Sequence, residues 1–243
     1  MIKMKTETGV DGFVERGRAM EMIIATHNPH KLREFQRILG PLGIVTKTAS
    51  LSEPEETGKS FMENARIKAR TACQETGLPA VADDSGICVD ALGGEPGIYS
   101  ARYGGQDLDD GGRLALLLKN MEEVPQEERG AHFTSAICCA FPNGEVVEAS
   151  GDCFGTLAFA PEGEEGFGYD PIFLWQGRSF GSLSGEEKDR HSHRGQALRL
   201  FAVRLTAYLS EKAAKSTEIQ NSIEENGNGC AMDSEMEGAK IDK

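Results

Sequence analysis

Short apolar runs alternate with helical spacings of apolar residues along the middle of this chain. Met22–Ala25 is an apolar run of strand length, and apolar residues at helical spacing follow it over Leu32–Leu39. Asn28 is suited to cap that helix, and Pro29 suits its first turn because the N–H that proline lacks would be unpaired there. The capping box Ser60–Glu63 predicts the start of a helix with Phe61, Ala65, Ala69 and Ala72 on one face, and further helices are predicted over Leu108–Met121 and His193–Leu209. Strands are predicted at Ala80–Ala82, Ile87–Val89, His132–Phe141 and Val146–Cys153.

The last two of these strands are expected to form a hairpin. Pro142-Asn143-Gly144-Glu145 separates them, and Asn-Gly is a strong signal for a tight turn. Because helices and strands are interleaved along the chain, the pattern favours an α/β fold. The hairpin is antiparallel, so the sheet should be mixed rather than wholly parallel.

The two ends of the chain lack this patterning. Residues 1–21 carry four basic and four acidic groups with no apolar period. Thr217–Lys243 is rich in Glu, Asn, Ser and Gly and has no aromatic residue, so it can bury too little to offset its ordering entropy. We expect a disordered extension at 1–21, one domain at 22–209, and a disordered acidic tail at 210–243.

Composition narrows the classes of partner. The chain has 243 residues and a formal net charge of −13, which argues against binding a nucleic acid polymer. Its longest uninterrupted apolar stretch, Ala136–Phe141, is far too short to cross a bilayer, and the first twenty residues show no apolar signal-peptide core. The six cysteines form no CxxC pair, so reduced and mostly buried thiols are expected. We therefore expect a cytoplasmic protein that binds neither membranes nor nucleic acid polymers.

The turn after the first strand, Thr26-His27-Asn28-Pro29-His30-Lys31, is the first candidate site. A helix N-terminus offers free N–H groups and a partial positive charge, which suits a phosphate. Thr26 adds a hydroxyl, Asn28 an amide, and Lys31 a full charge. A cation is unfavourable at this end of a helix unless an anion compensates it, which makes Lys31 informative. The alternative is a well-capped surface helix whose lysine points to water.

Asp83-Asp84-Ser85-Gly86 is the second candidate. Consecutive residues of a strand point to opposite faces, so at most one carboxylate would face a given ligand while the other makes a structural contact. A carboxylate at a strand end is a natural Mg²⁺ ligand, and a further one could come from Glu55-Glu56. The alternative is an Asx turn between two strands, which is common where Asp, Ser and Gly cluster.

Gly166-Phe167-Gly168-Tyr169-Asp170-Pro171 is the third candidate. Its glycines would let the backbone approach a flat ligand closely, with Phe167 as a stacking surface. Asp170 could then read a polar ring edge or fix a neighbouring donor. A core aromatic in a bulged strand fits the same pattern.

The fourth candidate is Glu186-Glu187-Lys188 together with Ser192-His193-Arg194-Gly195. Ser192 could cap the last helix and place His193 and Arg194 in its first turn. Lysine and arginine supply donors for phosphate or for carbonyl oxygens on a base. The alternative is a capped helix with a solvated, charged start.

Taken in this order, the four segments resemble the inosine triphosphate pyrophosphatase family, the RdgB-like dITP/XTP pyrophosphatases. The resemblance covers about residues 22–209, and the ordered set is specific although each motif alone is weak. Its motifs are Thr26-x-Asn28-x-x-Lys31, Glu55-Glu56-Thr57-Gly58, Ser60-Phe61-x-Glu63-Asn64-Ala65, Ala82-Asp83-Asp84-Ser85-Gly86, the run Leu92–Tyr103, Phe167-Gly168-Tyr169-Asp170-Pro171 and Ser192-His193-Arg194-Gly195.

The resemblance implies an elongated mixed sheet with flanking helices that form two lobes around a central cleft, in a homodimer. It implies Mg²⁺-dependent hydrolysis of ITP, dITP and XTP to the monophosphate and pyrophosphate, which would cleanse the nucleotide pool. The implied triphosphate site is Thr26–Lys31. Glu56 and Asp84 would bind Mg²⁺, and Asp84 would also activate the attacking water.

The rest of the implied site would hold the nucleoside. Ser85 would contact the nucleotide and Phe167 would stack on the base, with Gly168, Tyr169 and Asp170 completing that wall. Lys188, His193 and Arg194 would meet the base edge and the adjacent phosphate.

This assignment is chemically consistent with the residues. Hypoxanthine and xanthine carry a 6-oxo acceptor where adenine carries an amino donor, so a pocket of donors would leave adenine badly paired. Guanine shares the 6-oxo group, so its rejection must act at the 2-amino group. Two alternatives stay open from the sequence: a related Maf-like pyrophosphatase that acts on pyrimidine or modified nucleotides, and a nucleotide-binding regulator without turnover.

Overall fold

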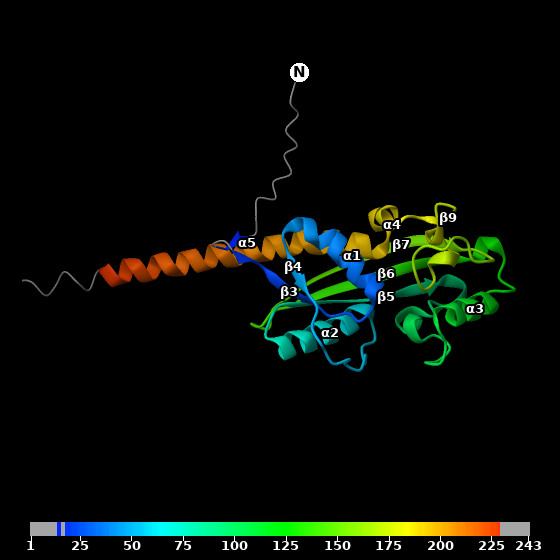
Figure 1. Ribbon diagram of the computed structural model, residues 1–243, viewed down its shortest axis with the longest axis horizontal. Coiled ribbons are helices and arrows are strands. Elements are labelled where there is room, and N and C mark those ends of the chain that lie inside the picture. The colour runs from blue at the N-terminus through cyan, green and yellow to red at the C-terminus, as the bar shows by residue number, and fades with distance from the viewer. Residues whose placement is uncertain (1–13, 16–17, 229–243) are drawn as a thin grey trace, which may run out of the picture. The chain divides into compact units, whose positions relative to one another are not determined.

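A seven-stranded mixed sheet organises the part of the chain that the structure describes (Figure 1). The computed structural model describes residues 14–15 and 18–228. The strand order is β4-β3-β5-β6-β7-β8-β9, with β3 parallel to both its neighbours and every later pair antiparallel. The predicted mixed sheet is therefore confirmed. The strands are β3 (Glu21–Ile24), β4 (Val45–Lys47), β5 (Ala80–Val89), β6 (Gly130–Ala140), β7 (Val146–Leu157), β8 (Phe173–Trp175) and β9 (Arg178–Ser179), and a separate pair is β1 (Val14–Glu15) with β2 (Arg18–Ala19).

The predicted hairpin is present as β6 and β7. Their register pairs Ala140 with Val146, and the turn between them closes through the N–H of Gly144, which donates to the carbonyl of Phe141 at 2.9 Å. Gly144 has a φ of 86°, a conformation that glycine adopts without the steric cost that other residues meet. The Asn-Gly signal thus identified the correct turn.

β5 corrects one prediction from the sequence. Residues 83–86 were expected to separate two strands, with an Asx turn as the alternative, but Ala80–Val89 is one continuous strand paired to β6 along its whole length. Asp83 and Asp84 are poor strand formers. The strand accommodates them because cationic side chains pair with both carboxylates, as described below.

Helices cover both faces of this sheet. In Figure 1, α2 lies on one side of β5 and β6 and α1 lies on the other. Asn28 caps α1 as predicted, because its Oδ1 accepts from the N–H of His30 at 2.8 Å. Ser60 caps α2, and Ser192 accepts from the N–H of Gly195 at the start of α5. The helices are α1 (Pro29–Leu39), α2 (Phe61–Thr76), α3 (Asp110–Asn120), α4 (Gly185–His191) and α5 (His193–Asn228), with short 3-10 segments at Gly40–Leu42, Asp90–Leu92, Gly97–Arg102, Gln126–Glu128, Asp170–Ile172 and Phe180–Ser182.

The last predicted helix is longer than expected. The last helix was expected to stop at Leu209, but α5 continues to Asn228. Its extra turns are rich in Ala, Glu and Lys, which favour helix, and Lys215 pairs with Glu211 one turn away. The chain divides into two units after Arg204, so α5 begins in the first and ends in the second. Residues 1–13, 16–17 and 229–243 of the expected extension and tail lie outside the described residues.

Two clusters of buried hydrophobic residues form core regions of the described structure, and they differ in the size of their side chains. Under α2, small residues predominate: Ala65, Ala69 and Ala72 are at most 1% exposed, as their spacing predicted, and they meet alanines and cysteines of β5 and β6. Around α3 and the far ends of β5, β6 and β7, the second cluster uses larger side chains such as Phe133 and Phe173. Within the described residues, no helix has the length and apolar character that a membrane span needs.

The five cysteines that the structure describes are free and mostly buried, as expected. Cys138 and Cys139 are adjacent on β6 and both are fully buried, and Cys73, Cys88 and Cys153 are also free. Burial raises the pKa of the Cys138 thiol to about 12. Such a thiol stays protonated and unreactive at neutral pH.

Arg129 holds one end of the sheet together from inside. Only 1% of it is exposed, and its guanidinium donates to the carbonyls of Leu157 (3.0 Å), Ala158 (2.9 Å), Met121 (2.6 Å) and Val124 (3.2 Å). These carbonyls belong to the end of β7 and to the segment after α3. A single buried cation therefore satisfies backbone acceptors that would otherwise be buried without partners.

We expect Arg129→Met to lower the free energy of unfolding by about 3 kcal/mol or more, because several buried carbonyls would lose a charged donor. Urea denaturation measures the change. Arg178→Met is the matched control: Arg178 forms an exposed ion pair with Glu187, so its loss should cost at most about 1 kcal/mol. Equal effects of the two substitutions would contradict the role given to Arg129.

Candidate active site

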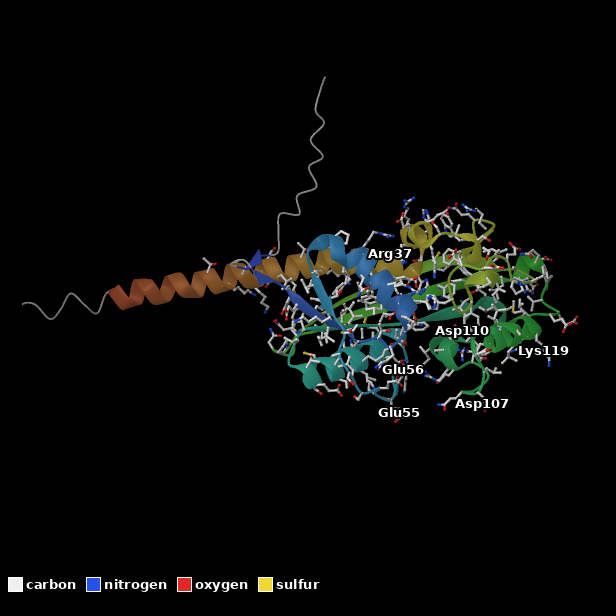
Figure 2. All side chains as sticks on the ribbon, viewed as in Figure 1. Arg37, Glu55, Glu56, Asp107, Asp110 and Lys119 are labelled. Atoms are coloured by element: carbon white, nitrogen blue, oxygen red, sulfur yellow. The ribbon has the colours of Figure 1, made fainter. Side chains whose placement is uncertain are left out.

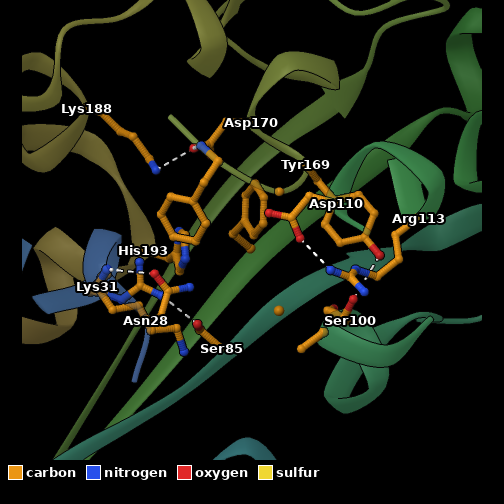
Figure 3. Close-up of a pocket in the computed structure, with 16 residues that line it drawn as sticks. Asn28, Lys31, Ser85, Ser100, Asp110, Arg113, Tyr169, Asp170, Lys188 and His193 are labelled. Carbon is orange, nitrogen blue, oxygen red and sulfur yellow. Dashed lines mark hydrogen bonds and ion pairs between the residues drawn. The ribbon is translucent and has the colours of Figure 1, made fainter. Parts of the chain in front are cut away.

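Two cavities meet beside the start of α1. The larger has a volume of about 670 Å³ and is lined by the turn after β3 and by residues 51–56. The smaller, of about 220 Å³, lies between residues 167–170 and the starts of α1 and α5 (Figure 3). Asn28, Lys31 and Ala101 line both cavities, so the two form adjoining parts of one site.

The turn before α1 contributes to both cavities. Thr26, His27, Asn28 and Lys31 line them, and the Oγ1 of Thr26 accepts from the N–H of Asn28 at 3.2 Å. Pro29 is not among the lining residues. Asn28 itself accepts from the N–H groups of His30 and Lys31, so what this turn adds to the wall shared by the two cavities is the Asn28 and Lys31 side chains.

Lys31 is not the solvated lysine that the alternative interpretation expected. Its side chain is 16% exposed, and its Nζ lies 3.1 Å from Oδ1 of Asp83. Burial lowers the pKa of Lys31, although the charge of Asp83 opposes that shift. The anion that compensates a cation at this helix end is therefore a carboxylate of the protein itself.

Asp83 and Asp84 point to opposite faces of β5, as their adjacency predicted. Asp83 meets Lys31 and the Nε of Arg194, the latter at 3.0 Å. Asp84 instead faces α2, where its oxygens accept from Nδ2 of Asn64 at 3.1 Å and from Nζ of Lys68 at 2.9 Å. One strand therefore supplies a carboxylate to each face of the sheet.

The pKa values of Asp83 and Asp84 are shifted in opposite directions. Burial acts to raise the pKa of Asp83, but the charges of Lys31, Arg194 and Lys68 outweigh burial and hold it well below the ordinary value. Burial also raises the pKa of Asp84, and there the opposing charge of Lys68 does not outweigh it. Neighbouring carboxyls whose pKa values are pushed apart are suited to different roles, one as a fixed anion and one as a proton acceptor.

Glu56 and Asp84 converge on one cation. Figure 2 shows Glu55 at the outer edge of its segment and Glu56 nearer the sheet. Nζ of Lys68 lies 2.9 Å from Oε1 of Glu56 and 2.9 Å from Oδ1 of Asp84, and Arg102 holds the other oxygen of Glu56 at 2.8 Å. Glu56 and Lys68 line the larger cavity, whereas Asp84 is not among its lining residues and contacts Lys68.

This convergence fits the donor set of a magnesium site. Mg²⁺ is commonly held by one or two carboxylates together with substrate phosphates and waters. Glu56 and Asp84 supply two such carboxylates around a position that already attracts the ammonium of Lys68. Among the residues described, no cluster of three or more His, Cys, Asp or Glu side chains has the arrangement of a complete metal site. The remaining ligands would have to come from substrate and water.

Phe167 forms the aromatic surface of the smaller cavity. It lies in a turn rather than in the bulged strand of the alternative interpretation, and its N–H donates to Oδ2 of Asp170 at 2.8 Å. The ammonium of Lys188 lies 4.7 Å from the centre of its ring, and the His30 ring stacks on it at 4.9 Å. Asp170 thus fixes both the aromatic turn and, through a 2.7 Å contact, Lys188.

The start of α5 is buried instead of solvated. His193 and Arg194 are 4% and 2% exposed, and both line the smaller cavity with Ser85, Gly168 and Tyr169. The His193 ring stacks on Phe133, and within the described residues its buried Nδ1 has no hydrogen-bond partner. Burial, together with the charge of Arg194, holds the pKa of His193 well below its ordinary value, so the ring is neutral. An unpaired nitrogen in a buried, neutral ring is a natural contact for a polar ligand.

Buried charges of alternating sign connect the two cavities. Each residue of this set contacts the next, from the larger cavity to the turn that carries Phe167. None has a side chain that is more than 16% exposed. We call this set the buried ion-pair chain, and its members are Lys31, Asp83, Arg194, Glu34, Lys188 and Asp170. Arg194 also donates to the hydroxyl of Ser85 at 2.6 Å.

Comparison with known proteins agrees with the motifs. Residues 22–204 match the Ham1 family model. The chain belongs to the Ham1 family. It is 48% identical over 176 residues to a dITP/XTP pyrophosphatase of Rhodopseudomonas palustris, an alignment that covers 69% of this chain and 84% of the relative. It is 47% identical over 187 residues to a dITP/XTP pyrophosphatase of Thermus thermophilus, covering 75% of this chain and 90% of the relative.

Solved structures of the Ham1 family share the fold. A HAM1 protein from Coxiella burnetii superposes with a TM-score of 0.71 at 39% identity and covers 77% of this chain and 99% of its own. A nucleoside-triphosphatase, named as a dITP/XTP pyrophosphatase, from Mycobacterium abscessus gives a TM-score of 0.62 at 45% identity and covers 74% and 98%. The family resemblance read from the motifs is confirmed.

Several polar residues of this Ham1 site were given no role by sequence reasoning. Asn64 and Lys68 stand one turn apart on α2 and both reach Asp84, and Arg102 reaches Glu56. Glu34 lies one turn after Lys31 on α1 and is 5% exposed. Spacing was an available signal for Glu34, which lies three positions after Lys31 on the same helix. Asn64 and Arg102 lie within the family motifs quoted above, whereas Lys68 is marked only by its place one turn after Asn64.

Glu34 tests whether the buried ion-pair chain stabilises the Ham1 fold. Its carboxylate joins Lys188 (3.3 Å) to Arg194, so Glu34→Gln leaves two buried cations short of an anion and should lower the free energy of unfolding by about 3 kcal/mol at pH 7. Burial acts to raise the pKa of Glu34, but the charges of Arg194 and Lys188 outweigh it and lower the pKa. The stabilisation is thus present above the ordinary pKa of about 4.3 and is lost as the pH falls through the lowered value.

Urea denaturation of wild type and Glu34→Gln at a series of pH values measures this difference. We expect the gap between them to close toward low pH. Glu187→Gln, which removes the anion of the exposed Arg178 pair, is the control and should change stability little at any pH. A gap for Glu34→Gln that is independent of pH would show that the loss comes from packing and not from charge.

Proposed function

We propose that this Ham1-family protein hydrolyses the non-standard purine nucleoside triphosphates dITP, XTP and ITP to the monophosphate and pyrophosphate. The observation that carries the proposal is the pair of adjoining cavities. One is lined by a helix start, two lysines and Glu56, with Asp84 in contact with one of those lysines, and the other holds an aromatic ring with buried donors. Relatives that are nearly half identical over most of the chain carry the name dITP/XTP pyrophosphatase, which supports the same substrate class.

The larger cavity would hold the triphosphate. Thr26 and Lys31, together with the partial positive charge at the start of α1, would bind phosphate oxygens. A water oxygen would attack the α-phosphorus, the bond from that phosphorus to the bridging oxygen would break, and pyrophosphate would leave. Asp84 would take a proton from the attacking water, the role of a general base.

Glu56 and Asp84 are the residues that would hold Mg²⁺. When bound, the ion would supply positive charge against the phosphate oxygens and the departing pyrophosphate. Lys68 would then turn from the two carboxylates toward the phosphates, since a cation at its place would repel it. Arg102 would keep Glu56 oriented through its other oxygen.

The smaller cavity would select the base. A purine stacked on Phe167 would present its 6-oxo group to the donors of Lys188 and to the His193-Arg194 start of α5. Adenine carries an amino donor at that position, so it would leave buried donors unpaired, which can discriminate strongly. A homodimer, which the family resemblance implies, and a cytoplasmic location, which composition and cysteine usage predict, belong to the same proposal.

Incubation of the purified chain with dITP and Mg²⁺ tests this function directly. We expect pyrophosphate to be released, much faster than from ATP or GTP, and the release to stop when a chelator removes the metal. Orthophosphate in place of pyrophosphate would contradict the proposed reaction. Pyrimidine triphosphates as the preferred substrates would favour a Maf-like activity, and binding without hydrolysis would favour a nucleotide-binding regulator.

Asp84→Asn separates the catalytic role from a structural one. We expect turnover of dITP to fall about 10²- to 10⁴-fold, because the variant has no general base, while nucleotide binding is largely kept. Burial opposes the ionised form of Asp84, and Lys68 keeps Glu56 as a partner when Asp84 is replaced, so we expect the variant to lose little stability.

Asp83→Asn is the matched control on the adjacent residue. Asp83 is paired with Lys31 and Arg194 and its pKa is lowered, so loss of its charge should lower the free energy of unfolding. Full activity of Asp84→Asn, or an equal loss of stability in the two variants, would contradict the separate roles of the two carboxylates.

A further inference from the structure

Arg113 faces the smaller cavity from the side opposite to the buried donors. It belongs to the first turn of α3, which Asp109 caps by accepting from the N–H of Gly112 at 2.8 Å. Figure 3 shows Arg113 and Tyr169 on one side of the cavity and Lys188 and His193 on the other. Neither composition nor the motifs of the sequence pointed to this arginine.

The guanidinium of Arg113 is held in place and still has free donors. It donates to the carbonyl of Leu108 and, at 2.6 Å, to Oδ1 of Asp110, and its side chain is 16% exposed. A guanidinium carries five N–H donors in a rigid plane, and these contacts use two of them. The protein therefore presents an oriented arginine with unused donors to the cavity.

Two of the polar groups beside Arg113 are already paired. The hydroxyl of Tyr169 donates to the carbonyl of Ser100 at 2.9 Å, and the hydroxyl of Ser100 is engaged with the backbone of Ile87 and Gly97. The third, Asp110, lines the same cavity and directs its Oδ1 to Arg113. A ligand acceptor that approaches this side therefore meets the remaining donors of Arg113, whereas a ligand donor could pair only with the carboxylate of Asp110, which Arg113 already engages.

The geometry of a purine gives this wall a specific target. Positions 2 and 6 of the ring lie on either side of N1. A base whose 6-oxo group points toward Lys188 and His193 therefore directs its 2-position away from those two residues. The wall away from them carries Arg113. We infer that Arg113 is a specificity-determining residue that reads the 2-position of the purine, an inference that rests on the proposed function.

This assignment ranks the bases by the group at position 2. Xanthine carries a 2-oxo acceptor, which would receive a charged hydrogen bond from Arg113. Hypoxanthine carries only hydrogen there and is neutral to the wall. Guanine carries a 2-amino donor, which would face the Arg113 cation and could pair only with Asp110, the carboxylate that Arg113 already engages, so Arg113 would oppose guanine where the 6-oxo group cannot.

Binding of nucleoside monophosphates to the full chain tests this role without requiring turnover. Calorimetric titration with xanthosine and inosine monophosphates gives the ratio of their affinities for each protein. In Arg113→Met we expect xanthosine monophosphate to lose about tenfold or more relative to inosine monophosphate, the size of a charged hydrogen bond. Guanosine monophosphate should gain relative to inosine monophosphate.

Arg70→Met, at an exposed position on α2 outside both cavities, is the matched control and should leave the ratios unchanged. Arg113→Lys, which keeps a charged donor, should recover part of the preference for xanthine. Arg113→Gln serves as a second variant if Arg113→Met does not bind inosine monophosphate. Ratios that stay within about twofold of wild type in both neutral variants would overturn the inference.

The outcome is independent of the hydrolysis assay. Release of pyrophosphate from dITP with unchanged binding ratios would leave the proposed function standing and reject the role of Arg113. A shifted ratio in a protein that releases no pyrophosphate would do the reverse, since the pocket would read the base without supporting the reaction.

Discussion

The buried ion-pair chain is the constraint on which the rest of the site depends. Three cations and three anions alternate from Lys31 to Asp170, and each inner member touches one of opposite sign on either side. A single buried charge would be expensive, and a single buried pair often gains little over apolar residues of the same shape. An alternating row differs because removal of one member leaves two neighbours short of a partner. The buried ion-pair chain thus fixes the positions of α1, β5, α4 and the start of α5 relative to one another.

The alternation of side chains along a strand lets one dipeptide serve two purposes. Asp83 enters the buried ion-pair chain on one face of β5, and Asp84 meets Asn64 and Lys68 of α2 on the other. The surroundings then separate their protonation: several cations hold the first ionised, while burial favours the neutral form of the second. A structural anion and a candidate base are therefore adjacent in sequence but contact different partners, while the charge of Lys68 acts on both.

Local signals in the sequence predicted much of this arrangement, and long-range pairing explains what they missed. The caps at Asn28 and Ser60, the Asn-Gly turn and the alanine face of α2 depend on neighbouring residues, so pattern alone located them. The continuity of β5 depends on cations from three helices, and no local pattern reports those. Glu34 was missed for the same reason, because its partners lie more than 150 positions away. The extension of α5 beyond Leu209 shows the opposite error, in which low hydrophobicity outweighed helix propensity.

The charge balance of the larger cavity explains how an acidic protein can be suited to an anionic ligand. At physiological ionic strength, surface charges more than about 8 Å away are largely screened. The charged groups near the cavity therefore determine its electrostatic potential. The charged residues that line this cavity are Lys31, Lys68, Arg102, Glu53, Glu55, Glu56 and Asp83. Its three cations thus face four acids, and a triphosphate that arrived alone would add negative charge to a site that already has an excess of it. In the proposed function, a substrate that brings its own divalent cation would offer that cation to Glu56 and Asp84 and leave Lys68 to its phosphates, so the excess of acids would favour the metal-bound nucleotide.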